Sequence, residues 1–209
     1  MIFFKNATKN IAFILASMLC LSSLNAFGQK IEDQIKSINS IDEANQFILV
    51  NENIDAQIWT IAPQIDENKS SRIFKNRTIG DIFSDGTNLY KIIDSRKTVA
   101  LRVSYIFLDG NKMSLQAINN LRKKIVNQYK NGAKFSDLAN QYTMDSAKDG
   151  DLSWFTEGTM VKEFETAIKK HNKNDIFTID LTKENWYYVA LKTYQDQIVE
   201  ELTILKVKS

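Results

Sequence analysis

The stretch GDLSWFTEGTMVKEFE, residues 150–165, is the most distinctive part of the sequence. Two glycines, Gly150 and Gly158, lie among large apolar side chains, which are Trp154, Phe155, Met160 and Phe164. The chain has one cysteine, Cys20, and one histidine, His171, and both lie outside this stretch. The pattern therefore indicates an apolar pocket with neither a thiol nor an imidazole for covalent catalysis or metal binding.

The sequence on both sides of this stretch predicts an α+β domain. Residues 100–108 alternate between apolar and polar side chains, as expected for a strand. The apolar face of this strand carries Leu101, Val103, Tyr105 and Phe107. Ser114 and Ser136 are typical N-caps of two helices that follow, and Gly132 suits the end of the first helix. The remaining elements are expected at 151–155 (strand), 161–170 (helix), 176–179 (strand) and 186–192 (strand).

Four stretches of the sequence resemble the parvulin-type peptidyl-prolyl isomerases and follow the order found in that family. They are LRVSYIFL (101–108), FSDLANQYTMDSAKDGDLSWF (135–155), EGTMVKEFE (157–165) and WYYVALKT (186–193). The resemblance covers nearly all of residues 100–194 and implies a small antiparallel four-stranded sheet packed with helices. It also implies a peptidyl-prolyl isomerase domain, which we place at residues 99–196.

The implied reaction fits the lack of a nucleophile, because proline isomerisation breaks no covalent bond. Its barrier, about 18–20 kcal/mol, comes from the partial double bond of the peptide unit. A protein lowers the barrier by holding the proline ring, excluding water and favouring the twisted peptide over either planar form. The resemblance implies that Leu152, Met160 and Phe164 line the proline pocket, with Phe155 beside them. It also places Asp145 at the position of the family's central acid or thiol, and it implies no cofactor.

The sequence departs from the family at two positions that commonly carry histidine. The first is Tyr105, and the second is Val189 or, with the register shifted by one residue, Tyr188. Tyr105 could donate a hydrogen bond to Asp145 in place of the imidazole. We therefore take Asp145 and Tyr105 as candidate catalytic residues, and Tyr188 and Val189 as candidates for substrate binding. The loop at 109–113 lacks the basic cluster of phosphate-directed family members, so no preference for phosphoserine is expected.

These departures leave two functions open. One is an isomerase that assists the folding of exported proteins. The other is a catalytically degenerate chaperone or scaffold that binds extended polypeptide without turning it over. In both cases the expected partners are extended or unfolded polypeptide clients that contain proline.

The first part of the chain repeats short motifs of the second part at a nearly constant separation. The matching pairs are ANQF (44–47) with ANQY (139–142), Trp59 with Trp154, and DIFS (81–84) with DIFT (175–178). A constant separation indicates a duplicated fold. Residues 29–98 would then form a degenerate half repeat that lacks a first strand and has no counterpart of Met160 and Phe164.

The C-terminal residues 197–209 contain VEELTILKV (199–207), which is rich in strand formers and resembles ALRVSYIFL (100–108). This segment could supply the strand missing from 29–98, since a sheet without it would leave backbone groups unpaired. A loose strand or tail is the alternative. The strand could also come from a neighbouring chain in a dimer, so the oligomeric state stays open.

Residues 1–28 have the features of a signal peptide. Two lysines precede an apolar run at 11–24, which is shorter than the roughly 20 residues of a membrane-spanning helix, and AFG at 26–28 suits cleavage before Gln29. A lipid on Cys20 is the alternative, disfavoured by the leucine before it. The sequence thus predicts an exported protein of the periplasm or cell envelope, with no membrane span after cleavage.

The charge balance argues against a nucleic-acid partner. The chain has 27 Lys and Arg and 25 Asp and Glu, so loss of two lysines with the signal peptide would make the counts equal. No basic stripe with interleaved aromatic residues is present. Asp145, Asp149 and Asp151 lack the spacing of a calcium-binding loop, so no metal is expected. His171 lies in KKHNKN and is expected to be a solvated loop residue.

Overall fold

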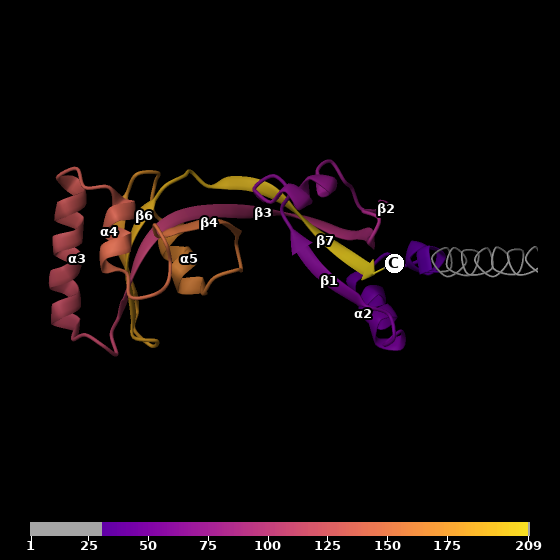
Figure 1. The fold of residues 1–209 in the computed structure, drawn as a ribbon, viewed down its shortest axis with the longest axis horizontal. Helices are drawn as coiled ribbons and strands as arrows, with labels where there is room; N and C mark the ends of the chain where they lie inside the picture. Colours follow the sequence, from indigo (N-terminus) through magenta and orange to yellow (C-terminus); the bar gives the residue numbers. More distant parts are fainter. Residues whose placement is uncertain (1–30, 209) are drawn as a thin grey trace, which may run out of the picture. The chain divides into compact units, whose positions relative to one another are not determined.

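The computed structural model describes residues 31–208, so the predicted signal peptide, its cleavage site and Cys20 lie outside the described residues. The chain divides into two compact units (Figure 1). Unit 1 consists of residues 31–61, 70–96 and 202–208, and unit 2 of Ala62–Lys69 and Lys97–Glu201. Among the described residues, no helix is long and apolar enough to cross a membrane.

The described residues form a mixed α and β structure, as the sequence predicts. After a helical segment at 31–36, the elements are α2 (Ile41–Val50), β1 (Ala56–Ile61), the 3₁₀ helix η1 (Lys69–Phe74), β2 (Ile82–Ser84), β3 (Asn88–Asp109), α3 (Leu115–Lys130), α4 (Phe135–Tyr142), β4 (Asp151–Thr156), α5 (Lys162–Lys169), β5 (Ile176–Leu181), β6 (Trp186–Lys192) and β7 (Gln197–Lys208). The long strand β3 contributes residues to both units, because the boundary between the units falls after Arg96.

The helix caps agree only partly with the sequence prediction. The Ser114 hydroxyl accepts a hydrogen bond from the Ala117 amide and so caps α3 as expected. Ser136 is not a cap, because α4 begins one residue earlier, at Phe135. The N-cap is Lys134, whose side chain makes no capping hydrogen bond. The Phe135 ring at the first residue of this helix is buried in the core, and such packing stabilises a short helix that lacks a polar cap.

The sheet of unit 2 is antiparallel, with the strand order β4-β3-β6-β5. Helices α3 and α4 cover one face of it and α5 covers the other (Figure 1). The face under α3 and α4 buries Ile106, Leu108, Ile118, Ile125, Leu138 and Val189. The face under α5 buries Leu101, Val103, Phe155, Phe164, Ile168 and Phe177. This is the four-stranded sheet with surrounding helices that the sequence predicts.

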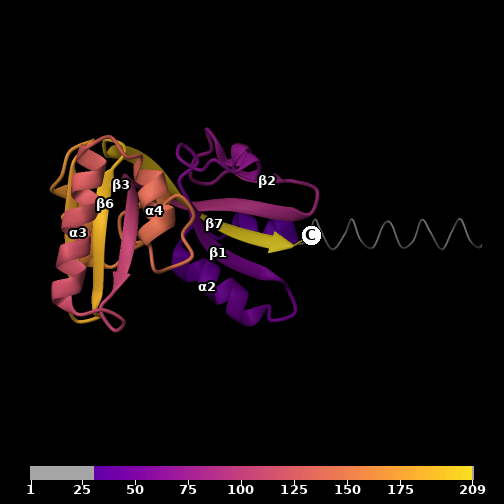
Figure 2. The same ribbon diagram turned by 60° about the vertical axis from the view of Figure 1, so that its left-hand side comes forward.

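The sheet of unit 1 has the strand order β1-β7-β3-β2, and Figure 2 shows β7 beside β1. The two strands pair antiparallel from Ala56↔Val207 to Ile61↔Leu202. The buried side chains of β7 in this unit include Leu202, Ile204, Leu205 and Val207. One face of the sheet packs against residues of the first two helices, among them Ile31, Ile35 and Phe47. The other face carries four aromatic rings, those of Trp59, Phe74, Phe83 and Tyr90.

The two sheets have the same strand order when β7 of unit 1 is matched to the second part of β3, which belongs to unit 2. In that match β1 corresponds to β4, β2 to β5, and the first part of β3 to β6. The duplication itself stays a prediction, since the match concerns topology alone. The segment Ala62–Lys69 belongs to unit 2, which the predicted boundary at 98/99 did not anticipate.

Candidate functional site

A cavity of about 170 Å³ opens in unit 2 on the face of the sheet that α5 covers. It is lined by Tyr105, Asp145, Leu152, Met160, Val161, Phe164, Trp186 and Tyr188. These residues come from strands β3, β4 and β6, from helix α5, and from the two loops that precede β4 and α5. The cavity thus has a rigid base of strands and a helix, with loop residues at its walls.

The apolar part of the cavity is built around Phe164. Its ring is 5% exposed and packs edge-on against Tyr188, with the ring centroids 5.2 Å apart. Tyr188 in turn packs edge-on against Tyr105 at 6.0 Å. Phe164 is therefore both a wall of the cavity and part of the core beneath it, so its removal would affect stability as well as binding.

The polar part of the cavity is centred on Asp145. Its Oδ2 accepts a hydrogen bond from the Tyr105 hydroxyl at 2.9 Å, the bond that the sequence suggested. Its Oδ1 accepts from the Thr143 hydroxyl at 2.7 Å and from the Ala147 amide at 3.1 Å. These three bonds hold the carboxylate in one orientation at the cavity wall.

The two tyrosine hydroxyls of the cavity keep their protons at neutral pH. Burial raises the pKa of Tyr105 well above its usual value, and the hydrogen bond to Asp145 adds to this. Burial raises the pKa of Tyr188 to about 12, with the negative charges of Asp145 and Glu184 contributing. Both phenols are therefore able to act as hydrogen-bond donors.

Gly150 allows the loop before β4 to approach the strand that carries Tyr105. Its φ of +70° favours glycine, and a Cβ there would lie 2.6 Å from the Tyr105 carbonyl oxygen and 2.7 Å from the Ala139 Cβ. The Gly150 carbonyl accepts a hydrogen bond from the Tyr105 amide at 2.8 Å. The first glycine of the 150–165 stretch is thus needed for the geometry of the site.

Glu165 holds the loop that forms the other wall, a role that sequence reasoning missed. Glu165 is 4% exposed, and its carboxylate accepts hydrogen bonds from the Gly158 amide at 3.0 and 3.1 Å and from the Met160 amide at 2.9 Å. The partners are backbone groups, so they leave no trace in residue types. The available signal was an acidic residue in the first turn of a helix that follows a glycine-containing loop.

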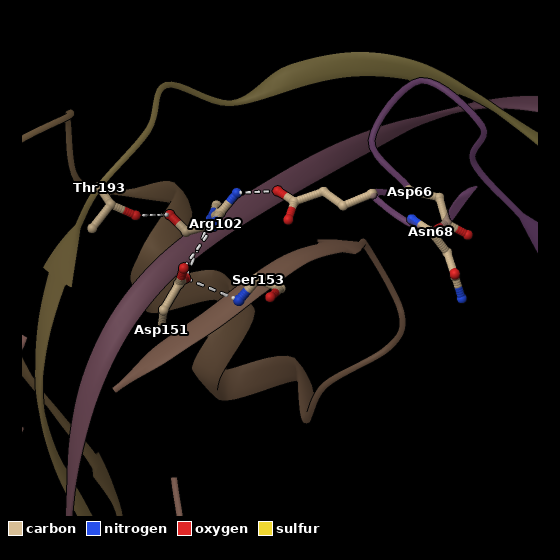
Figure 3. Close-up of polar contacts among 7 residues, drawn as sticks. Asp66, Asn68, Arg102, Asp151, Ser153 and Thr193 are labelled. Carbon is tan, nitrogen blue, oxygen red and sulfur yellow. Dashed lines mark hydrogen bonds and ion pairs between the residues drawn. The ribbon is translucent and has the colours of Figure 1, made fainter. Parts of the chain in front are cut away.

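Arg102 ties the start of β4 to strand β3 (Figure 3). Its guanidinium donates to the two carboxylate oxygens of Asp151 at 2.6 and 3.2 Å and to Glu67 at 2.7 Å. The Asp151 carboxylate also accepts from the Ser153 amide at 3.0 Å. Arg102 lowers the pKa of Asp151 below its usual value. Because Leu152 follows Asp151, this network fixes one residue of the cavity lining.

Six of the predicted site residues line the cavity, and two do not. The six are Tyr105, Asp145, Leu152, Met160, Phe164 and Tyr188. Phe155 lies in the core on the α5 side, 6% exposed. Val189 is fully buried on the opposite face, because it pairs with Ile106 whereas Tyr188 pairs with Phe107.

Two lining residues, Val161 and Trp186, were not predicted. Trp186 lies two residues before Tyr188 on β6, so strand alternation could have identified it. His171 lies outside the cavity lining and in a loop, as expected, but its side chain is only 35% exposed. Its ring stacks on Phe177 with centroids 3.7 Å apart. Within residues 31–208, no group of three or more His, Cys, Asp and Glu side chains is arranged to hold a metal ion.

The fold and the cavity are features of one class of protein. The comparison with known families identifies this class. The family model of the PPIC-type PPIase domain matches residues 87–192. The chain therefore belongs to this parvulin-type family.

Individual relatives match this chain either over a short stretch or at low sequence identity. Foldase protein PrsA 1 of Bacillus cereus is 44% identical over 57 residues, which cover 26% of this chain and 20% of that protein. The chaperone SurA of Nitrosococcus oceani is 24% identical over 156 residues, covering 68% of this chain and 34% of that protein. The chain thus spans about a third or less of these relatives' lengths.

Among solved structures, PrsA of Bacillus anthracis is similar at 28% identity and a TM-score of 0.40, covering 48% of this chain and 44% of that one. A SurA-like chaperone of Campylobacter jejuni is similar at 18% identity and a TM-score of 0.38, covering 99% of this chain and 73% of that one.

Proposed function

We propose that this chain catalyses cis–trans isomerisation of the peptide bond before proline in unfolded, exported polypeptide. The observation that carries the proposal is the cavity of unit 2, which combines an apolar base with a hydrogen-bonded carboxylate and two phenols. An apolar cavity with a few fixed polar groups is typical of a binding site for a small ring.

In this proposal the proline ring packs between Leu152, Met160 and Phe164. Water is excluded there, which favours the less polar, twisted peptide over the conjugated planar forms. The Tyr188 hydroxyl, which keeps its proton, donates to the carbonyl oxygen before the proline as it rotates. Asp145 fixes the Tyr105 hydroxyl, so the wall of the cavity does not need to reorganise during the rotation.

A second function, binding without turnover, is favoured by one observation. One of the two positions that commonly carry imidazoles in the family is occupied by Tyr105, and Tyr188, one of the two candidates for the other position, lines the same cavity. A phenol with a raised pKa does not take up a proton near neutral pH as an imidazole does. The pocket would then hold proline-containing segments as a chaperone does.

Isomerisation of a short proline peptide separates the two functions. The exchange rate between cis and trans forms is measured by NMR alongside the peptide Kd. We expect wild type to accelerate exchange, and Met160→Ala to reduce both binding and rate by about tenfold, equivalent to about 1.4 kcal/mol. Ile198→Ala, which removes an apolar side chain that is 70% exposed and outside the cavity lining, is the control and should change neither.

Asp145→Ala should lower the rate more than the affinity, since the acid acts mainly on the twisted state. If wild type and Asp145→Ala both bind the peptide without accelerating exchange, the chain is a binder. A gain of rate in Tyr105→His would then show that a degenerate site has kept its pocket.

We also propose that the chain is exported and that its mature form begins at Gln29. The charged start and short apolar run of residues 1–28 support this proposal. Mass spectrometry of protein from the native host should find Gln29 as the first residue. An intact Met1 or a lipid on Cys20 would contradict it.

A further inference from the structure

The lining of the cavity carries a negative charge without a counter-ion. Among the described residues that line it, Asp145 is the only aspartate, glutamate, lysine, arginine or histidine. Its hydrogen-bond donors are two hydroxyls and one backbone amide. Within residues 31–208, no lysine or arginine forms an ion pair with it.

A second acid adds to the negative potential of the site. Glu184 lies in the turn that joins β5 to β6, two residues before Trp186. Its charge acts on the Tyr188 hydroxyl in the same direction as that of Asp145, after the larger effect of burial. The potential at the Tyr188 hydroxyl is therefore set by two acidic side chains, one in the cavity lining and one in the neighbouring turn.

The outer part of the cavity is aromatic. Trp186 is 39% exposed and lies on the same face of β6 as Tyr188. The faces of such rings attract lysine and arginine side chains, more strongly for tryptophan than for other rings. A carboxylate and an indole in the lining of one cavity are complementary to a cation on an extended apolar stem.

We propose that this site selects polypeptide segments in which lysine or arginine directly flanks the proline. The proline ring occupies the apolar base, while the neighbouring cation lies between Asp145 and Trp186. Acidic and phosphorylated residues beside the proline are repelled by the same carboxylate. Their own charge would also lose its hydration on entering the site. This inference rests on the proposed function of the cavity and names its substrate class.

Three peptides that differ only in the residue before proline test the inference. Lysine, alanine and glutamate are compared, and both the Kd and the isomerisation rate are measured. We expect the lysine peptide to be preferred over the glutamate peptide by about fivefold at low salt, as for partly exposed charge pairs. The ratio should shrink at high salt because the Debye length shortens. A second set with lysine or glutamate after the proline covers the other flank.

Variants outside the proposed catalytic groups locate the preference. Glu184→Gln and Trp186→Leu should each reduce the lysine-to-glutamate ratio, while Glu184→Gln should leave the alanine peptide unchanged. Glu163→Gln removes an exposed acid of α5 that does not line the cavity and serves as the matched control. A ratio that falls in the two variants and not in the control supports the proposal.

Equal Kd values for the lysine and glutamate peptides would overturn the inference while leaving the proposed function intact if turnover persists. A preference unaffected by salt, Glu184→Gln and Trp186→Leu would overturn it as well. If peptides bind without turnover, the ratio of Kd values still decides the inference, and only the proposed isomerase activity fails. If no peptide binds or is turned over, both fail.

Discussion

The sheets of units 1 and 2 have the same strand order, but one face of the sheet is covered differently in the two units. In unit 2 this face leaves a cavity between Phe164, Tyr188 and the neighbouring loops. In unit 1 the Phe74 ring packs edge-on against Trp59, Phe83 and Tyr90 at centroid distances of 5.2–5.5 Å. The same type of sheet can therefore support a binding site or a closed aromatic core, depending on the side chains placed over it.

The segment that covers each face explains the difference. In unit 2 the loop before α5 is held by the Glu165 carboxylate through the amides of Gly158 and Met160. In unit 1 the short helix η1 ends at Phe74, whose ring enters the core. We propose that the two units arose by duplication, and that unit 1 lost its pocket when the loop was replaced by this aromatic insertion.

Removal of β7 should have the largest effect and should separate the two units. Deletion of residues 198–209 removes Leu202, Ile204, Leu205 and Val207 from the core of unit 1. We expect a loss of several kcal/mol, comparable with much of the net stability of a domain. Hydrogen exchange should rise across 31–95 more than across 100–194. Unchanged protection in 31–95 would show that β7 is dispensable, and light scattering of wild type tests whether the strand is exchanged between chains.

Alanine at an apolar position over this face of the sheet should cost more in unit 1 than in unit 2. Phe74 is 3% exposed within an aromatic cluster, so Phe74→Ala should cost about 3–5 kcal/mol of unfolding free energy in urea. Met160 is half-buried at the wall of an open cavity, so Met160→Ala should cost far less. Equal losses would mean that the cavity behaves as a closed core.

Glu165 should be important for the order of the pocket wall. Glu165→Ala leaves the amides of Gly158 and Met160 without their acceptor, at a cost of about 1–3 kcal/mol. Exchange of these two amides should speed up, and the peptide KM should rise. Glu165→Gln keeps one acceptor oxygen and should recover part of both effects. Slow exchange of both amides in Glu165→Ala would refute this role.

Substitutions in the Arg102 network should have the smallest effects on the free energy of unfolding. The effects should differ between the two partners of Arg102, Glu67 and Asp151. Glu67 is 69% exposed, so Glu67→Gln should cost about 0–1 kcal/mol. Asp151 accepts two hydrogen bonds from Arg102, and Asp151→Asn should cost more.

The pH dependence gives a further check on Asp151. Its pKa is lowered in the folded state, so its contribution is present above the unfolded pKa of about 3.9 and is lost as pH falls through the folded value. Acid unfolding of Asp151→Asn should lack this component. A curve identical in shape to that of wild type would contradict the assigned pKa direction.

The sequence was sufficient to predict unit 2 because its local signals agree with one another. Alternation along 101–107 placed Tyr105 on the face of the cavity, and the 150–165 stretch supplied Met160 and Phe164. The choice between Tyr188 and Val189 could not be made, because both faces of β6 are buried and a shift of one residue reverses them. Phe155 lies beside the pocket residues in the core cluster that contains Phe164, and the sequence could not separate a core role from a lining role because both favour the same apolar side chains.

Other features depend on contacts that residue types do not encode. The roles of Glu165 and Gly150 arise from backbone groups at a specific distance. The packing of Ala62–Lys69 with unit 2 depends on the exposed pair Arg102–Glu67 and on a small apolar cluster that includes Ala62 and Val199. Neither shows a periodic pattern in the sequence.

Acceleration of a proline-limited refolding reaction is the measurement that tests the proposed site most directly. The uncatalysed step takes about 10–100 s at 25 °C, so catalysis is easily resolved. We expect wild type to accelerate it, Met160→Ala in unit 2 to lose most of the effect, and Ile79→Ala, an exposed apolar position in unit 1, to retain it. A wild-type chain that binds the unfolded client without changing its refolding rate, or acceleration that survives Met160→Ala, would contradict the assignment of an isomerase site to this cavity.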